Sequence, residues 1–173
     1  MKHLLTTIFF LIGVIASAQQ ETFFNQFWNN QTHYNPAFAG MEYQMQTGAL
    51  YRSQWDGVNG SPDNLYAFYN MRLKEDWGIG INMDLGAIGF SRTLNFSIPA
   101  SYRIQLNDKH TIALGVAATF NHHSVDDGLI PPETEDDIFL ISGSQQYLTA
   151  QSGVVYDNPW LTGSVSIRQI PIT

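Results

Sequence analysis

The side chains best suited to bind a metal are two adjacent histidines followed by two aspartates, His122, His123, Asp126 and Asp127. Imidazole and carboxylate groups are common ligands of zinc and other divalent ions. Adjacent residues of a β-strand point to opposite faces, so the two imidazoles converge only if the chain turns there. We therefore interpret them as polar residues at the end of a strand that enters a loop, and no metal is expected.

A second group of oxygen ligands surrounds Pro131 and Pro132. Clusters of carboxylates bind calcium, but the glycine-punctuated spacing of an EF-hand loop is absent here. A run of like charges is more typical of a solvated loop. The acids of this group are Asp126, Asp127, Glu133, Glu135, Asp136 and Asp137.

No catalytic motif is found in the chain. The nucleophile elbow G-x-S-x-G, the zinc motif H-E-x-x-H and the glycine loop of nucleotide-binding proteins are absent. Ser97 and Ser101 lie on the polar face of a predicted strand, without a histidine at a matching depth. The sequence predicts a protein that is not an enzyme, with no catalytic residues and no cofactor.

The segments that carry these residues show a strand pattern, which is strongest in residues 94–106. Apolar and polar side chains alternate there, with Pro99 as the single break in the polar set. Successive strand side chains point to opposite faces, so the segment has an apolar face and a polar face. It is long enough to cross a bilayer, which takes a tilted strand of about 9 to 11 residues. Pro99 predicts a bulge or a local bend.

The same alternation predicts an all-β fold with about seven strands. Trp77, Tyr51 and Phe120 fall where lipid-facing aromatic anchors of a membrane barrel belong. Trp160 falls on the polar parity, which means either that it precedes its strand or that the register there differs. The predicted strands are residues 44–53, 64–73, 77–85, 94–106, 111–120, 147–156 and 161–168.

The connections between these strands alternate in length. Short turns are predicted at 74–76, 107–110 and 157–159, and longer loops at 54–63, 86–91 and 124–146. Outer-membrane barrels have short periplasmic turns and longer extracellular loops, so this order predicts an antiparallel up-and-down outer-membrane β-barrel. On this interpretation Trp55 and Phe90 face the cell exterior. Arg52, Arg72 and Arg103 fall on the inward parity and are expected to pair with Asp84 inside the barrel.

Composition and the first residues agree with export to a membrane. Residues 1–18 have the layout of a signal peptide, with Lys2, an apolar run and Ala16-Ser17-Ala18. The chain has 15 acidic and 8 basic residues, which argues against nucleic-acid binding, and it has no cysteine for a disulfide or a lipid anchor. Only 13% of its residues are charged, against about 25% in soluble domains, which suits a surface that faces lipid.

Several motifs occur in an order that resembles the PorP/SprF family. They are FNQF at residues 24–27, YNPAFAG at 34–40, YRSQW at 51–55 and SYRIQL at 101–106. The resemblance implies an outer-membrane barrel associated with type IX protein secretion and with surface assembly of partner proteins such as gliding adhesins. The implied partners are type IX secretion components, a secreted surface protein and outer-membrane lipid. The candidate partner-binding residues within these motifs are Asn35, Pro36, Gly40, Arg52 and Trp55.

We therefore expect three regions: a signal peptide at 1–18, a periplasmic or lumen segment at 19–43, and a partial transmembrane barrel at 44–173. Residues 35–40 are interpreted either as a turn that leads into the first strand or as a segment packed in the lumen or against a partner. The odd number of strands predicts a truncated or split gene product, or half of a barrel that a second chain completes. Two other functions remain open, a secreted soluble β-sandwich that binds surfaces and a barrel conduit for a small hydrophobic molecule.

Overall fold

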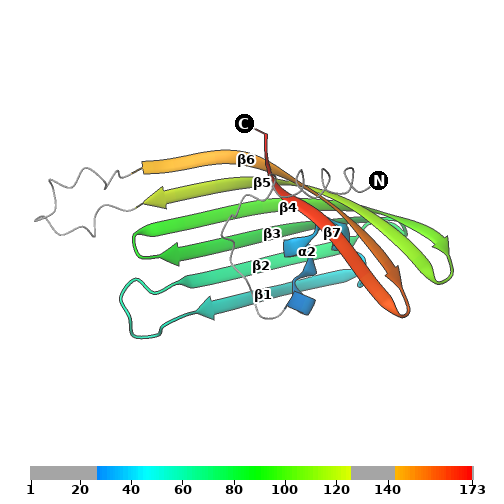
Figure 1. The fold of residues 1–173 in the computed structure, drawn as a ribbon, viewed down its shortest axis with the longest axis horizontal. Helices are drawn as coiled ribbons and strands as arrows, with labels where there is room; N and C mark the ends of the chain where they lie inside the picture. Colours follow the sequence, from blue (N-terminus) through cyan, green and yellow to red (C-terminus); the bar gives the residue numbers. More distant parts are fainter. Residues whose placement is uncertain (1–26, 126–142, 173) are drawn as a thin grey trace, which may run out of the picture.

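The computed structural model describes residues 27–125 and 143–172, most of which form one antiparallel sheet (Figure 1). Its seven strands follow one another in chain order, so the topology is up-and-down as predicted. The predicted signal peptide and acidic loop residues lie outside the described residues. The strands are β1 (Met45–Ser53), β2 (Asp63–Arg72), β3 (Trp77–Ile88), β4 (Ser91–Asn107), β5 (His110–Val125), β6 (Gly143–Asn158) and β7 (Leu161–Pro171).

All seven predicted strands are confirmed, but the loop predicted at 86–91 is wrong. Strands β3 and β4 continue through this region and pair Ile88 with Ser91, which leaves a turn of Gly89 and Phe90. Gly89 has φ +56°, the left-handed conformation that tight hairpin turns require. The alternation of apolar and polar residues is weak there, because Gly86 and Ala87 differ little in hydrophobicity.

Pro99 does not shift the register of the sheet. The ladder between β3 and β4 is interrupted between the pairs Ile79↔Ala100 and Asn82↔Ser97, and the same register resumes beyond the gap. Proline has no N–H to donate, so this local loss of pairing is what it imposes. The ladder from Pro99 to β5 is unbroken.

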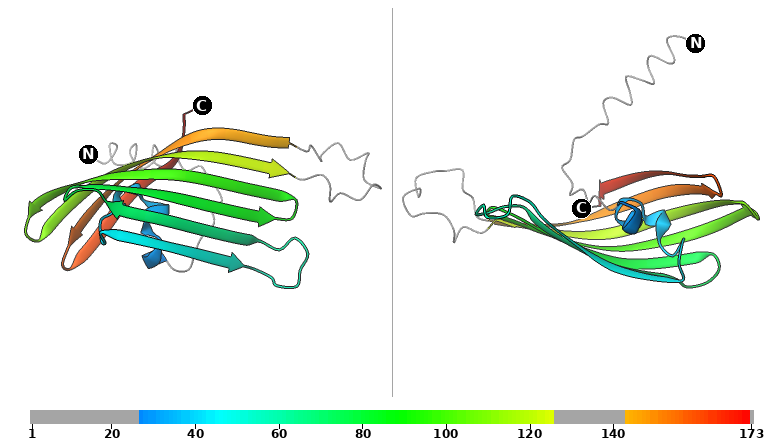
Figure 2. Two further views of the ribbon diagram at one scale, coloured as in Figure 1. Left: turned by 180° about the vertical axis from the view of Figure 1, so that it is seen from behind. Right: turned by 90° about the horizontal axis from the view of Figure 1, so that it is seen from below.

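The sheet is strongly curved and is not closed, since β1 and β7 are its two edges in the described part of the chain. Its concave face holds the N-terminal residues, which form η1 (Phe27–Asn29), α2 (Gln31–Tyr34) and η2 (Pro36–Phe38). Figure 2 shows this segment lying inside the trough, with β7 curling up beside it. Among the described residues, no helix is long and apolar enough to cross a membrane.

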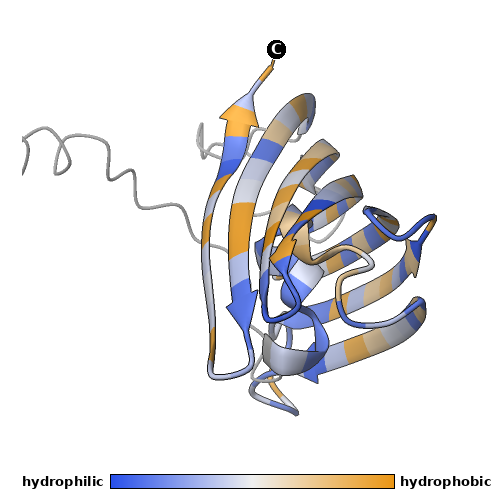
Figure 3. Ribbon diagram, turned by 90° about the vertical axis from the view of Figure 1, so that its right-hand side faces the viewer, coloured by the Kyte–Doolittle hydropathy of each residue, from blue (hydrophilic) through white to orange (hydrophobic). Residues whose placement is uncertain are grey.

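Hydrophobic and hydrophilic residues alternate along the strands (Figure 3), and the exposure of their side chains makes the two faces of the sheet opposite in polarity to those of a soluble protein. On the convex face large apolar side chains are exposed, for example Val116 at 62% and Val165 at 74%. On the concave face polar residues such as Asn82, Asp84 and Thr119 are buried. Water-soluble domains bury their large apolar residues, whereas membrane barrels turn them toward lipid. The described strands form a single sheet, so the sandwich alternative is not supported.

Candidate functional site: the concave face and its strap

Residues 27–41, which we call the strap, cross the concave face near the ends of the strands that carry the short turns. Asn35 marks the break between α2 and η2, with an extended backbone at φ −149° and ψ 116°. A residue before proline avoids the helical region, which explains why the helix stops there. The Asn35 side chain accepts a hydrogen bond from Ala37 N at 2.9 Å, and Pro36 starts the next helical turn.

Glycines of the sheet let the strap backbone lie directly on the strands. A Cβ at Gly78 would overlap the carbonyl oxygen of Ala39, and one at Gly115 would overlap the backbone of Ala37. At Gly153 it would overlap the side chain of Asn35. These glycines lie on β3, β5 and β6, so the small residues on the inward parity of the strands form the surface that receives the strap.

Asn35 fastens the strap to the far side of the sheet. Its Nδ2 donates to the carbonyl oxygens of Val154 and Val165, each at 3.2 Å. The side chain is therefore bonded to β6 and β7 as well as to its own turn. Since the residue is only 2% exposed, it has no contact surface available to another molecule in this arrangement.

Two arginines hold the other end of the strap. Arg72 donates from Nε to the Gly40 carbonyl at 3.0 Å and from Nη2 to the Met41 carbonyl at 2.7 Å. Arg103 donates to the same Gly40 oxygen at 2.8 Å. Both arginines were expected to pair with Asp84, and that prediction is wrong, because the strap brings carbonyl oxygens closer to them than the carboxylate lies. Gly40 itself has φ +62°, which favours glycine at this position.

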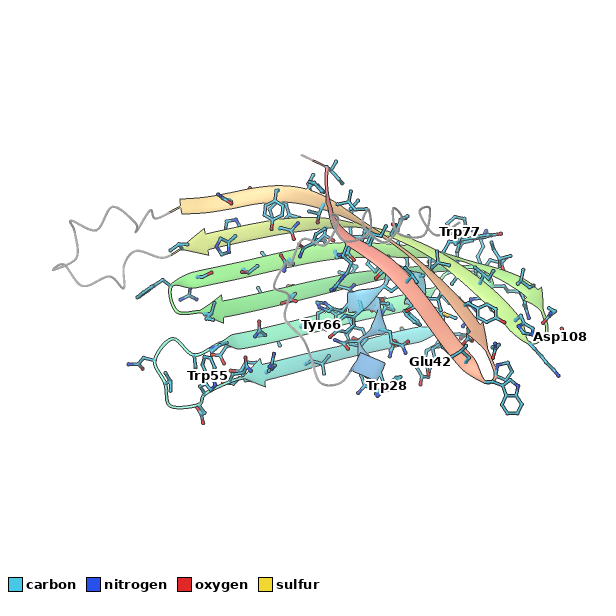
Figure 4. All side chains as sticks on the ribbon, in the orientation of Figure 1. Trp28, Glu42, Trp55, Tyr66, Trp77 and Asp108 are labelled. Atoms are coloured by element: carbon cyan, nitrogen blue, oxygen red, sulfur yellow. The ribbon has the colours of Figure 1, made fainter. Side chains whose placement is uncertain are left out.

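The middle of the strap packs on an aromatic pair of β2. Tyr66 is fully buried and stacks on Phe68, with ring centroids 5.6 Å apart, while His33 meets Tyr66 edge-on at 4.8 Å. The position of Tyr66 beneath the strap can be followed in Figure 4. His33 Nδ1 also lies 4.0 Å from Asp84 Oδ2, which places the buried carboxylate of β3 next to the strap.

The half of the concave face beyond the strap is a cavity of about 850 Å³ on the side of the longer loops. Most of the residues that line it carry amide, hydroxyl or charged groups, which matches the polar interior of outer-membrane barrels. Arg52 lines this cavity together with Asp84, so the third predicted arginine does face the interior. Other polar lining residues include Gln54, Asn95, Asn121 and His123.

Of the predicted metal candidates, the structure describes His122 and His123; Asp126 and Asp127 lie outside the described residues. His122 pairs with Leu94 on the apolar parity, whereas His123 pairs with Thr93 on the polar parity, so the two side chains leave the strand on opposite faces, and both residues border the cavity. In residues 27–125 and 143–172 no group of three His, Cys, Asp or Glu is placed to hold a metal. Ser101 Oγ donates to the Ala39 carbonyl at 2.6 Å, which gives that serine a role in holding the strap.

Aromatic residues lie at both ends of the strands on the convex face. Near the short turns Trp77 and Tyr102 are neighbours, with ring centroids 4.9 Å apart. Near the longer loops the Tyr51 hydroxyl donates to Asp63 at 3.0 Å. Trp160 is 95% exposed in the turn between β6 and β7, so it precedes its strand, which was the first of the two predicted explanations.

Trp55 lies at the loop end of the molecule, opposite Trp77 (Figure 4). Its side chain is 69% exposed. Its backbone has φ +57°, a left-handed conformation that non-glycine residues rarely adopt. The β1–β2 loop that carries Trp55 is held to the β3–β4 turn, where Gly89 N donates to Gly60 O at 2.9 Å. These two connections and the adjoining end of β3 expose four large apolar side chains, which we call the loop-end patch: Trp55, Val58, Ile88 and Phe90.

The candidate partner-binding residues thus fall in three different places. Trp55 is exposed, Arg52 lines the cavity, and Asn35, Pro36 and Gly40 are buried in the strap. The motif match drew attention to all five, but only their burial separates an exposed residue from those that position the strap. Their role in partner binding stays a prediction.

An antiparallel up-and-down sheet with an apolar convex face, a polar concave face and aromatic residues at both ends defines the class of outer-membrane β-barrel proteins. The family model for the type IX secretion system membrane protein PorP/SprF matches residues 16–171. The chain belongs to this family and is an outer-membrane component of type IX secretion. Comparisons with curated proteins and with solved structures gave no match.

Proposed function

We propose that this protein acts by binding rather than by catalysis, and that its loop-end patch contacts a secreted surface protein during type IX secretion. The observation that supports this most directly is Trp55, a large exposed side chain on a strained backbone. A left-handed conformation costs a non-glycine residue on the order of 1–3 kcal/mol. Glycine would avoid that cost, so stability alone does not account for a tryptophan here.

The patch has the features of a binding surface. Exposed tryptophan and phenylalanine side chains are enriched among the residues that dominate protein interfaces. The hydrogen bond between the β1–β2 loop and the β3–β4 turn pre-organises the patch, which lowers the entropy lost on binding. Because the patch lies beyond the apolar belt of the strands, a protein partner can reach it from the aqueous side.

In this proposal the end with the β1–β2 loop and the β3–β4 turn faces the cell exterior, and the end with the β2–β3, β4–β5 and β6–β7 turns faces the periplasm, because outer-membrane barrels have their longer loops outside. The turn between β2 and β3 carries the exposed charged residues Lys74, Glu75 and Asp76, which are suited to contacts with periplasmic secretion components. The strap residues Asn35, Pro36 and Gly40 support these surfaces by holding the strands in place. Arg52 contributes a positive charge to the cavity wall.

The two edges of the sheet need partners as well. An unpaired strand edge within hydrocarbon leaves N–H and C=O groups without hydrogen bonds, at several kcal/mol for each group. We therefore propose that further strands, from another segment or from a second chain, pair with β1 and β7 to complete the barrel. The polar lining of the cavity does not favour a conduit for hydrophobic molecules, so that alternative is not proposed.

A paired tryptophan experiment tests the role of the patch. Outer membranes from cells that carry the tagged protein are extracted in detergent, and the surface proteins that co-purify are quantified by mass spectrometry. Trp55→Ala should lose the surface protein, whereas Trp160→Ala, which removes a more exposed tryptophan at the opposite end, should retain it. Equal recovery with Trp55→Ala, at equal amounts of protein in the membrane, would refute the proposal.

A further inference from the structure

The convex face carries a hollow of about 420 Å³ near the loop end, on the side that faces lipid. It is bounded by one row of residues that lie opposite one another on five consecutive strands. A second row on the same face lies two residues closer to the loop end of each strand. The first row is Tyr51, Leu65, Leu85, Leu94 and His122, and the second is Asp63, Ala87, Arg92 and Ser124.

The two rows mark a change of polarity along the convex face. Leu65, Leu85 and Leu94 continue the apolar belt, whereas the next row is charged or hydroxylated apart from Ala87. The short side chain of Ala87 lies between Asp63 and Arg92 in the register and leaves the space that forms the hollow. Its volume falls within the roughly 300–1,000 Å³ of ligand pockets in proteins.

The charged groups of the hollow are arranged asymmetrically. Arg92 and His122 lie on the β4–β5 side, and the Asp63 carboxylate on the β2 side accepts a hydrogen bond from Tyr51. His122 Nδ1 is buried and has no hydrogen-bond partner within the described residues. The hollow therefore joins the three leucines of the apolar belt to a basic side chain, Arg92, and to the imidazole-bearing His122.

A ligand for this hollow must therefore be apolar at one end and anionic at the other. We propose that it binds a phosphate-bearing lipid of the surrounding membrane, with an acyl chain over the three leucines and the phosphate between Arg92 and His122. The planar fork of a guanidinium matches the geometry of phosphate oxygens and can bond two of them at once. This inference rests on the outer-membrane location and not on the loop-end patch, so each can fail without the other.

Lipid retention in native mass spectrometry tests the site. The full chain is purified in a neutral detergent and mixed with phosphatidylglycerol, with diacylglycerol of the same chains, or with inorganic phosphate. The wild-type protein should retain phosphatidylglycerol and should retain diacylglycerol weakly. Arg92→Gln should lower the affinity for phosphatidylglycerol about ten-fold or more, as expected for the loss of a charged hydrogen bond.

Three further variants separate a lipid site from general adhesion. Ala87→Leu fills the hollow and should abolish retention, and Asp63→Asn should strengthen it, because the carboxylate repels phosphate while the amide still accepts from Tyr51. Lys109→Gln removes a positive charge at the opposite end and should change nothing. Each variant is compared with the wild type by far-UV circular dichroism, so that only folded protein is scored.

Three results would overturn the proposal. Equal retention by wild-type and Arg92→Gln protein would exclude a phosphate contact at this position. Equal retention of diacylglycerol and phosphatidylglycerol would show that the hollow makes only apolar contacts with lipid. If inorganic phosphate binds and prevents lipid retention, and the protein does not prefer one lipid over the other, the hollow is a simple anion site.

Discussion

Replacing Asn35 by aspartate should release the strap from the sheet, because the two side chains have the same shape and differ in their donors. The carboxylate can still accept from Ala37 N, but it can no longer donate to the Val154 and Val165 carbonyls. Each of these part-buried hydrogen bonds contributes about 0.5–1.5 kcal/mol. Two such losses give about 1–3 kcal/mol, and repulsion between the carboxylate and the carbonyl oxygens acts in the same direction.

Hydrogen exchange of the strap, followed by mass spectrometry, measures this directly, since local opening exposes its amides. A loss of about 2 kcal/mol corresponds to roughly 30-fold faster exchange of peptides that cover residues 30–41. Asn107→Asp is the matched control, because Asn107 uses only its oxygen, accepting from Lys109 N and His110 N, and aspartate preserves both bonds. If the strap of the Asn35→Asp protein exchanges as slowly as that of the wild type, the hydrogen bonds of Asn35 do not hold it.

Three other substitutions test the packing, the arginine contacts and the strained loop. Gly78→Ala should weaken docking of the strap by about 1–3 kcal/mol, because the added methyl group overlaps Ala39. Gly163→Ala is the control and should have little effect, because Gly163 faces open space. Hydrogen exchange of the strap amides measures both. Arg103→Gln should cost about 1.5–3 kcal/mol by loss of the charged bond to Gly40, seen as a lower urea midpoint in detergent, and an unchanged midpoint would contradict it. Trp55→Gly should raise the free energy of unfolding by up to about 1 kcal/mol, seen as a higher urea midpoint, while abolishing partner recovery; a lower midpoint would argue against backbone strain.

The strand pattern was readable from the sequence because it depends on neighbouring residues alone. Residues 94–106 alternate so regularly that β4 could be located without any knowledge of its partners. The boundaries were less certain where Gly86 and Ala87 blur the contrast between the faces, and there the predicted loop proved to be part of the β3–β4 hairpin. Residues 86–88 are strand residues because they pair with β4, and that pairing is not visible in the local sequence.

The candidate site was only partly accessible to sequence reasoning. The motif of residues 34–40 stood out in the sequence, but nothing there indicated that it lies on the glycines of the strands. The sequence also suggested Asp84 as the partner of Arg72 and Arg103, because all three share the inward parity. Parity tells which face a side chain points to, but not which group the rest of the chain places beside it.

The sequence by itself determined an all-β membrane protein with seven strands, one apolar face and one polar face, because a period of two residues is a local property of the chain. Only the tertiary structure decided where the strap lies and which residues form the hollow on the convex face. These features join positions far apart, such as Asn35 and Val165, which are separated by 130 residues. Contacts of that kind depend on register, curvature and close backbone approach, which arise only when all the strands are assembled.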